Sequence, residues 1–138
     1  MNALLDSCSW DLSDFSSLTA YTILLMFYHT GVRVSELINM NDADVDMIND
    51  VVKVCGKGNK QRVVPFGAEL KQAVADYIAM RDSAVAVNGR ALFVTSGGER
   101  LKYHQVYNIV KTNLARVATV KKKSPHVLRH TFATAMLN

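Results

Sequence analysis

Residues 11–31, with the sequence DLSDFSSLTAYTILLMFYHTG, constrain the fold of this 138-residue chain more than any other stretch. Capping residues (Asp11, Ser13 and Asp14) open the segment and Gly31 closes it, which is the pattern of a helix with defined ends. Between these ends the apolar side chains are Leu18, Tyr21, Ile23, Leu24, Leu25 and Tyr28. We therefore expect a well-buried helix.

The length and composition are those of a single soluble domain. Polar side chains interrupt each apolar run before it reaches the roughly 18–20 residues of a membrane span. The opening MNALLDSCSW lacks the basic region of a signal peptide. Cys8 and Cys55 lack the spacing of a zinc site or a disulfide framework, and we expect both to be buried free thiols in a reducing compartment. The chain is expected to be cytoplasmic, with no membrane partner.

The rest of the pattern alternates helices with one pair of β-rich runs. A short helix is expected in VRVSELINMN, followed by a turn-rich acidic loop over residues 39–46. Val51–Cys55 and Arg62–Phe66 flank a loop with two glycines and an asparagine, which predicts a hairpin with a basic tip. Helical spacing returns in GAELKQAVADYIAMRDSAVAV and from Tyr103 to about Val120, separated by an extended ALFVTSGGERL. The sequence thus predicts a mainly α domain with a small antiparallel β-hairpin or sheet, an α+β fold.

Charge is divided unevenly along the chain. Residues 1–50 carry eight acidic residues and one basic residue, Arg33, whereas residues 51–138 carry fifteen basic and four acidic ones. This split lies within a net charge of +4 and favours a surface that faces a polyanion. One basic face is also common in ordinary domains, so charge alone leaves both interpretations open.

Three cationic stretches stand out, which are TGVRVSEL, GKGNKQR and HVLRH. In the first, Arg33 has apolar neighbours, which suits a guanidinium held for bidentate phosphate contact; a salt bridge to Glu36 is the simpler alternative. In the second, Lys57 stands between two glycines at the hairpin tip, with Lys60 and Arg62 beside it. Such a lysine can bind a phosphate, donate a proton to a leaving oxygen, or serve solubility alone.

The third stretch falls in a last expected helix. His126 and Arg129 are three residues apart and share a helix face, and His130 lies on the neighbouring strip. Two histidines without nearby carboxylates do not favour a metal site, and no cofactor is expected. Three lysines precede this helix, namely Lys121, Lys122 and Lys123. They form either a solvated linker or a contact to a nucleic-acid backbone.

Together these groups suit phosphoryl transfer without a metal. Charge that develops on the non-bridging oxygens needs positioned cations, and a leaving alkoxide needs a proton donor. Arginines can meet the first need, and a lysine or histidine the second. A nucleophile is missing from the set.

Four stretches resemble the tyrosine recombinases, or phage-type integrases: TGVRVSELINM, VVKVCGKGNKQRVVPFG, LFVTSGGERL and PHVLRHTFATAML. They run from about residue 20 to the end in the family's order and with comparable spacing, so the set is far more specific than any one motif. The resemblance implies the family's mainly helical catalytic-domain fold. It also implies site-specific recombination of double-stranded DNA through a 3′-phosphotyrosyl intermediate, by a full-length protein that acts as a tetramer on paired sites.

The resemblance also implies a role for each matching residue. Arg33 becomes the first catalytic arginine, and Lys57 the hairpin lysine that protonates the leaving 5′-oxygen. His126 assists proton transfer, and Arg129 clamps the scissile phosphate. Residues implied to support the site are Glu36 and His130. Residues expected to contact DNA are Lys60, Arg62, Lys121, Lys122 and Lys123.

The departure from the family lies after the H-x-x-R box. In the family a tyrosine nucleophile follows this box by a few tens of residues, whereas nine residues follow Arg129 here. The tyrosines of this sequence all precede the box and are expected to pack rather than react: Tyr21, Tyr28, Tyr77, Tyr103 and Tyr107. We therefore expect residues 1–138 to be a partial catalytic domain, lacking the nucleophile segment and the N-terminal DNA-clasping domain. Such a fragment would be inactive alone and could be monomeric.

Two other functions remain open. A recombinase-derived regulator that binds DNA without catalysis would use the same basic surface. An RNA-binding domain would interleave exposed aromatic residues with its basic ones, and KGNKQR and VKKKSP contain none.

Overall fold

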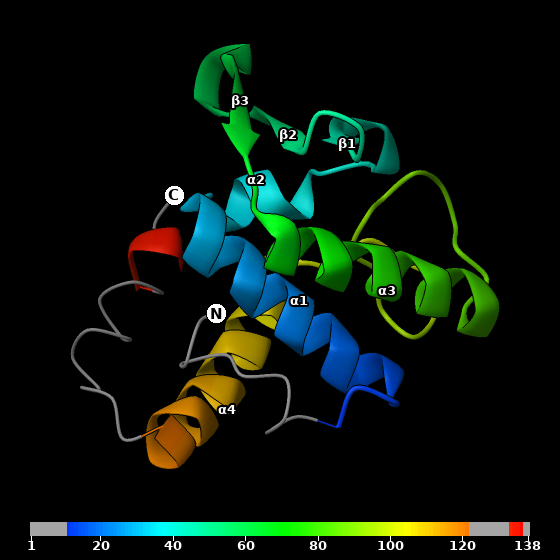
Figure 1. Ribbon diagram of the computed structural model, residues 1–138, viewed down its shortest axis with the longest axis vertical. Coiled ribbons are helices and arrows are strands. Elements are labelled where there is room, and N and C mark those ends of the chain that lie inside the picture. Colours follow the sequence, from blue (N-terminus) through cyan, green and yellow to red (C-terminus); the bar gives the residue numbers. More distant parts are fainter. Residues whose placement is uncertain (1–10, 122–132, 137–138) are drawn as a thin grey trace.

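The computed structural model describes residues 11–121 and 133–136, with residues 114–121 by their backbone only. It is a mainly helical domain with one small antiparallel sheet, which confirms the expected α+β class (Figure 1). In chain order the elements are α1 (Phe15–Thr30), α2 (Val34–Ile38), the 3₁₀ turn η3 (Asp42–Asp44), β1 (Val45–Asp46), β2 (Val51–Cys55), the 3₁₀ turn η4 (Lys57–Asn59), β3 (Gln61–Pro65), α3 (Ala68–Ala84) and α4 (Tyr103–Lys121). Residues 133–136 are also helical.

Helix α1 has the ends that its sequence predicts. The carboxylate of Asp14 accepts a hydrogen bond from the Ser17 amide at 3.0 Å and so satisfies one of the free amides of the first turn. Gly31 closes the helix in the left-handed conformation, with φ of 68°, and its amide donates to Phe27. Glycine adopts this conformation at no steric cost, so the chain turns sharply there toward α2.

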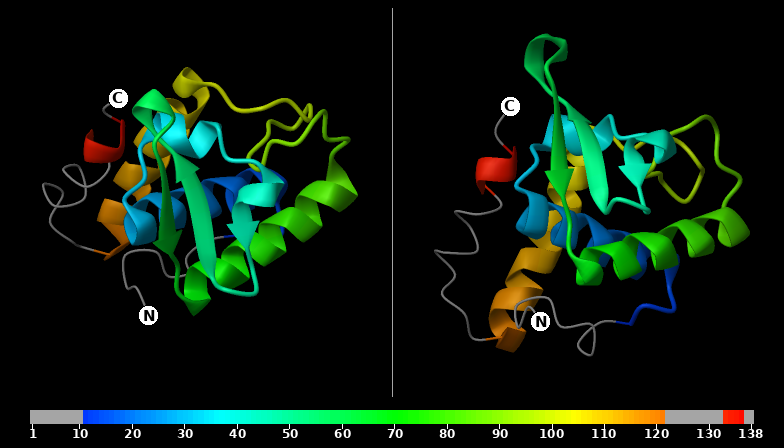
Figure 2. Two further views of the ribbon diagram at one scale, coloured as in Figure 1. Left: turned by 90° about the horizontal axis from the view of Figure 1, so that it is seen from above. Right: turned by 45° about the horizontal axis from the view of Figure 1, so that its top comes forward.

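The core of the domain is built around α1. All residues from Leu18 to Phe27 are buried, which leaves this stretch without an exposed face. Helices α3 and α4 both contact α1, which lies between them (Figures 1 and 2). The buried hydroxyls of Thr19 and Thr22 donate to the carbonyl oxygens of the preceding turn at 2.7 Å, which offsets their desolvation. Within the described residues, no helix is long and apolar enough to cross a membrane.

The sheet has the order β1-β2-β3, and both pairings are antiparallel. Val52 and Val54 of β2 are buried, whereas Lys53 and Cys55 alternate with them and are exposed. The prediction that Cys55 is buried is therefore wrong, because this register places its thiol on the outer face. Cys8 lies outside the described residues. The β2–β3 hairpin projects from the helices beyond α2 (Figure 2).

Two further expectations differ from the structure. The acidic loop contains the short strand β1, whose Val45 pairs with Val52, and two residues are too few to show an alternating pattern in sequence. Helix α3 ends at Ala84 rather than at residue 87, and Val85 is already extended with φ of −132°. The β-branched valines of this segment favour that extended backbone.

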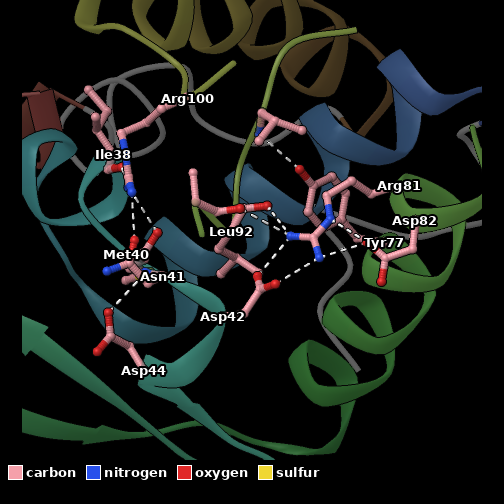
Figure 3. A network of polar contacts seen from close by, with 12 residues as sticks. Ile38, Met40, Asn41, Asp42, Asp44, Tyr77, Arg81, Asp82, Leu92 and Arg100 are labelled. Carbon is pink, nitrogen blue, oxygen red and sulfur yellow. Dashed lines mark hydrogen bonds and ion pairs between the residues drawn. The ribbon is translucent and has the colours of Figure 1, made fainter. Parts of the chain in front are cut away.

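Residues 85–102 contain no helix or strand and are held in place by Arg81 (Figure 3). This side chain is 2% exposed and donates to the carbonyl oxygens of Ala91 and Leu92 at 3.2 and 2.9 Å. Its two terminal nitrogens also bind both carboxylate oxygens of Asp42, at 2.8 and 2.9 Å. One guanidinium therefore joins α3, η3 and the irregular segment.

Arg100 performs a similar task at the end of α2 (Figure 3). Its Nη1 donates to the carbonyl oxygens of Ile38 and Met40 at 2.7 and 3.2 Å, and its Nη2 donates to the side chain of Asn41 at 2.6 Å. The carbonyls that a helix leaves unpaired at its C-terminus are thus satisfied by a cation, which also suits the helix dipole. The short helix α2 is fixed at this end.

Candidate active site

The turn that carries Arg33 lies between two buried apolar side chains. Val32 and Val34 are both 0% exposed, whereas Arg33 between them is exposed. The amide of Arg33 donates to Oε1 of Glu36 at 2.7 Å, which caps the first turn of α2. The backbone at Arg33 is therefore held by the core on both sides and by a carboxylate, while its side chain begins at the surface.

The loop of the β2–β3 hairpin presents Lys57. The loop closes on itself, because the Gly56 amide donates to the Lys60 carbonyl at 2.8 Å. Gly58 and Asn59 have φ values of 73° and 59°, a left-handed pair that turns the chain back toward β3. Lys57 and Lys60 are exposed, as expected for a basic tip.

Glu36 joins the Arg33 turn to this hairpin. The carboxylate is only 6% exposed and forms a two-bonded ion pair with Arg62 of β3, at 2.5 and 3.1 Å. A Cβ atom added to Gly56 would lie 3.1 Å from Oε2 of Glu36, so the hairpin backbone approaches this carboxylate closely. The Glu36 carboxylate thus binds the amide of Arg33 and the guanidinium of Arg62.

Two opposing effects set the charge state of Glu36. Burial of the carboxyl group favours its neutral form. The hydrogen bonds from Arg62 and from the Arg33 amide, with the charges of both arginines, outweigh burial and lower the pKa of Glu36 below its usual value. The same pair raises the pKa of Arg62. Both groups are therefore charged at neutral pH, as an ion pair at the base of the hairpin tip.

Replacing Glu36 by glutamine is expected to lower the free energy of unfolding at pH 7 by about 2 kcal/mol, the range of a hydrogen bond to a charged group. A lowered carboxyl pKa stabilises the fold above the unfolded value, here near 4.5, and this stabilisation is lost as the pH falls through the folded value. The difference between Glu36→Gln and the unmodified chain should therefore shrink between pH 5 and pH 3 in urea unfolding. Asp76→Asn, at an exposed carboxylate, is the matched control. A difference that persists at pH 3 would contradict this account.

The structure brings together one part of the predicted site and does not describe the other. Arg33, Glu36, Lys57, Lys60 and Arg62 lie on the adjoining α2 turn and β2–β3 hairpin. The predicted residues that lie outside the described residues are Lys122, Lys123, His126, Arg129 and His130. Lys121 is the last residue of α4 and is described by its backbone only. The roles of all these residues stay predictions.

The contacts of Glu36 bear on the expected roles of Arg62 and Arg33. Arg62, expected to contact DNA, has its guanidinium bound to Glu36. Glu36 is contacted by the backbone amide of Arg33. The link between Arg62 and Glu36 was missed because 26 positions separate them and no local pattern marks long-range ion pairs. Among the described residues, no group of three His, Cys, Asp or Glu side chains could hold a metal ion.

The five tyrosines all lie within the described residues. Tyr21 and Tyr77 are buried, and burial raises the pKa of Tyr77 to about 12. The hydroxyl oxygen of Tyr77 accepts a hydrogen bond from the Val94 amide at 3.0 Å. Tyr103 stacks on Tyr107 and donates its hydroxyl to the carbonyl of residue 136 at 3.2 Å. Tyr21 and Tyr77 are thus packing groups of the core, as expected, whereas Tyr28, Tyr103 and Tyr107 are exposed at 38%, 42% and 44%.

Comparison with known proteins gives a consistent result. The sequence profile of the phage integrase family matches residues 1–138. The tyrosine recombinase XerC of Staphylococcus saprophyticus is 39% identical over 138 residues, which cover 100% of this chain and 46% of that protein. XerC of Thermodesulfovibrio yellowstonii is 38% identical over 120 residues, covering 83% of this chain and 40% of that protein. The chain thus spans about half the length of the curated relatives that it matches.

Solved structures share the fold. The crystal structure of XerA recombinase matches with a TM-score of 0.72 and 31% identity, over 95% of this chain and 46% of that chain. The XerH site-specific recombinase bound to its difH substrate, in a pre-cleavage complex, matches with a TM-score of 0.71 over 95% of this chain and 39% of that chain. The match to XerH is only 23% identical in sequence and therefore shows the fold alone.

Proposed function

The chain belongs to the phage integrase family, and we propose from this that it supplies the phosphate-activating part of a site-specific DNA recombinase. The observation that carries the proposal is the joining of two cation-bearing turns. The Arg33 turn and the Lys57 hairpin meet at the buried carboxylate of Glu36, and both present exposed cations. One DNA phosphate that lies over this junction would meet a guanidinium and an ammonium together.

The reaction that we propose for the whole protein is attack of a tyrosine on a DNA phosphodiester. The phenolic oxygen forms a bond to phosphorus as the bond from phosphorus to the 5′-oxygen breaks. The phenolic proton passes to His126, and Lys57 gives a proton to the 5′-oxygen, which leaves as a hydroxyl. Arg33 and Arg129 neutralise the charge on the non-bridging oxygens. Attack by the 5′-hydroxyl of a new partner strand on the phosphotyrosine reverses these steps.

This scheme needs neither a metal nor ATP. The covalent intermediate keeps the phosphodiester bond energy, so rejoining requires no second energy source. The cations of the protein take the place that Mg²⁺ has in other phosphoryl transfers. Lys60 and the three lysines that end at residue 123 are proposed to contact the DNA backbone on either side, which positions the duplex without reading its sequence.

We propose that the nucleophile is a tyrosine outside this sequence. Two of the five tyrosines present are buried in the core, at Tyr21 and Tyr77, and a buried phenol cannot meet a DNA phosphate. The others lie on α1 and α4 and precede the H-x-x-R box. The 138-residue chain alone is thus proposed to bind DNA weakly without cleaving it. The full-length protein is proposed to act as a tetramer on paired sites.

Covalent trapping on nicked DNA tests this function. The parent gene product, expressed through its natural C-terminus, is mixed with nicked duplexes that carry candidate target sites and is separated on a denaturing gel. A nick lets the short 5′-hydroxyl fragment diffuse away, so an adduct between protein and DNA should accumulate. The 138-residue chain, tested in parallel, should form none. Binding to a verified site without an adduct would instead favour a regulator that has lost catalysis, and cleavage by the short chain would contradict the placement of the nucleophile.

A further inference from the structure

The contacts of Arg62 differ from those expected of a residue that binds DNA. It is the second residue of β3 and lies opposite Val54 in the register. Its guanidinium turns to the helical body and takes both oxygens of Glu36. Within the part of the chain that the structure describes, Lys53 and Lys60 of the same hairpin form no ion pair, although Arg62 is exposed as they are. Arg62 therefore differs from its cationic neighbours in where its charge is engaged.

We propose that Arg62 is a positioning residue for Lys57. By binding the buried carboxylate of Glu36, Arg62 fixes the hairpin against the turn of Arg33, so that Lys57 and Arg33 act on the same phosphodiester. The inference rests on the proposed function and adds to it a residue that acts through another rather than on the substrate.

The geometry of the junction supports this role. Val52 and Val54 hold the base of the hairpin in the core, but they lie on the strand and leave the loop beyond residue 55 projecting from the domain. A backbone hydrogen bond from the Gly56 amide to the Lys60 carbonyl closes the loop, which ties its two ends together. A pair at Arg62 therefore constrains the whole loop, including Lys57.

The Glu36 carboxylate lies close to the backbone on both sides of the junction, at Gly56 next to Lys57 and at Arg33. Gly56 lies close enough to Glu36 that an added Cβ would be 3.1 Å from Oε2, and Lys57 is the next residue. The other oxygen of Glu36 accepts from the Arg33 amide at 2.7 Å. A shift of the hairpin away from Glu36 thus changes the separation of Lys57 from Arg33, and a misplacement of about 1 Å in a catalytic group can cost about 10²-fold in rate.

Replacing the leaving oxygen by sulfur separates positioning of Lys57 from contact with the phosphate. A 5′-bridging phosphorothiolate releases a thiolate, and because a thiol has a pKa of roughly 8.5 it leaves without a proton donor. Lys57→Ala should therefore form adducts slowly with the oxygen substrate, by about 10²-fold, and at nearly the unmodified rate with the sulfur substrate. Arg33→Ala should be slow with both.

We expect Arg62→Gln to behave as Lys57→Ala does. Its rate of adduct formation should fall by about 10- to 100-fold on the oxygen substrate and should return to nearly the unmodified rate on the sulfur substrate. Arg62→Lys keeps the charge but not the two-bonded geometry. Its rate on the oxygen substrate should lie between those of the unmodified protein and Arg62→Gln. Lys53→Gln removes a cation from the same hairpin and should leave the ratio of oxygen to sulfur rates unchanged. Circular dichroism and thermal melting of each variant confirm that the protein remains folded.

Each outcome decides the matter. Equal losses on both substrates with Arg62→Gln, or no loss on either, would overturn the positioning role. If Arg62→Gln released about one counterion fewer on binding DNA, seen as a shallower dependence of the binding constant on salt concentration, Arg62 would contact a phosphate instead. If Lys57→Ala shows the sulfur rescue and Arg62→Gln does not, the inference fails and the proposed function stands. If the unmodified protein forms no adduct with either substrate, the proposed function fails and the inference falls with it.

Discussion

Replacing Arg81 by alanine is expected to lower the free energy of unfolding by about 3 kcal/mol, the low end for removing one partner of a buried ion pair. The side chain is 2% exposed, and its loss leaves the buried carbonyl oxygens of Ala91 and Leu92 without a donor. The low end applies because Asp42 and Asp82, its two acidic partners, are 47% and 57% exposed and can regain water. Urea unfolding followed by circular dichroism measures the change.

The same helix supplies a matched control. Lys71 forms an ion pair with Asp50 at 2.8 Å, but both side chains are more than 40% exposed. An exposed pair contributes about 0–1 kcal/mol, so Lys71→Ala should have a small effect. Arg81→Met restores most of the buried volume without the donors and should remain destabilised by about 2 kcal/mol. If Arg81→Met were as stable as the unmodified chain, the hydrogen bonds to the irregular segment would contribute little.

Replacing Arg33 by alanine is expected to slow covalent adduct formation by the full-length protein about 10³-fold. Loss of one positioned donor to a developing oxyanion costs about 10²–10³ in rate, and loss of an arginine that stabilises a phosphoryl transition state about 10³–10⁵. The fold should be nearly unaffected, because the turn is held by the backbone amide bond to Glu36 and by the buried side chains of Val32 and Val34. Single-turnover rates on nicked DNA measure the effect.

Arg90 provides the control for charge alone. It is an exposed arginine in the irregular segment and contributes its backbone carbonyl to the Asp42 amide. Arg90→Ala removes the same charge and should keep the rate within about twofold, in line with a surface substitution away from the site. A loss of less than tenfold for Arg33→Ala would remove Arg33 from the proposed catalytic set.

The sequence predicted the elements whose signals are local. Asp14 and Gly31 mark the ends of α1 because capping and a left-handed turn depend on single residues. Two β-rich runs on either side of a loop with two glycines and an asparagine predicted the hairpin for the same reason. The family fold expected from the four motifs is confirmed by the match to XerA recombinase. What could not be predicted is long-range, such as the pairing of Val45 with Val52 and the burial of Glu36 under the hairpin.

The uneven division of charge along the chain also reflects ion pairs between its early and late elements. Three acidic residues of the first fifty bind cations that follow residue 50, in the pairs Glu36 with Arg62, Asp42 with Arg81 and Asp50 with Lys71. A part of the charge asymmetry thus stabilises contacts between early and late elements rather than facing a polyanion. Composition cannot separate these two uses of charge, because it does not record which side chains meet.

The irregular segment of residues 85–102 is held largely by hydrogen bonds between two arginine side chains and main-chain oxygens. Arg81 donates to main-chain oxygens of this segment, and Arg100 donates from it to main-chain oxygens of Ile38 and Met40. Since every residue carries a carbonyl oxygen, substitutions that preserve volume at the acceptor positions leave these bonds available. Drift in the sequence of such a segment, while the two arginines persist, is therefore compatible with an unchanged path of the chain.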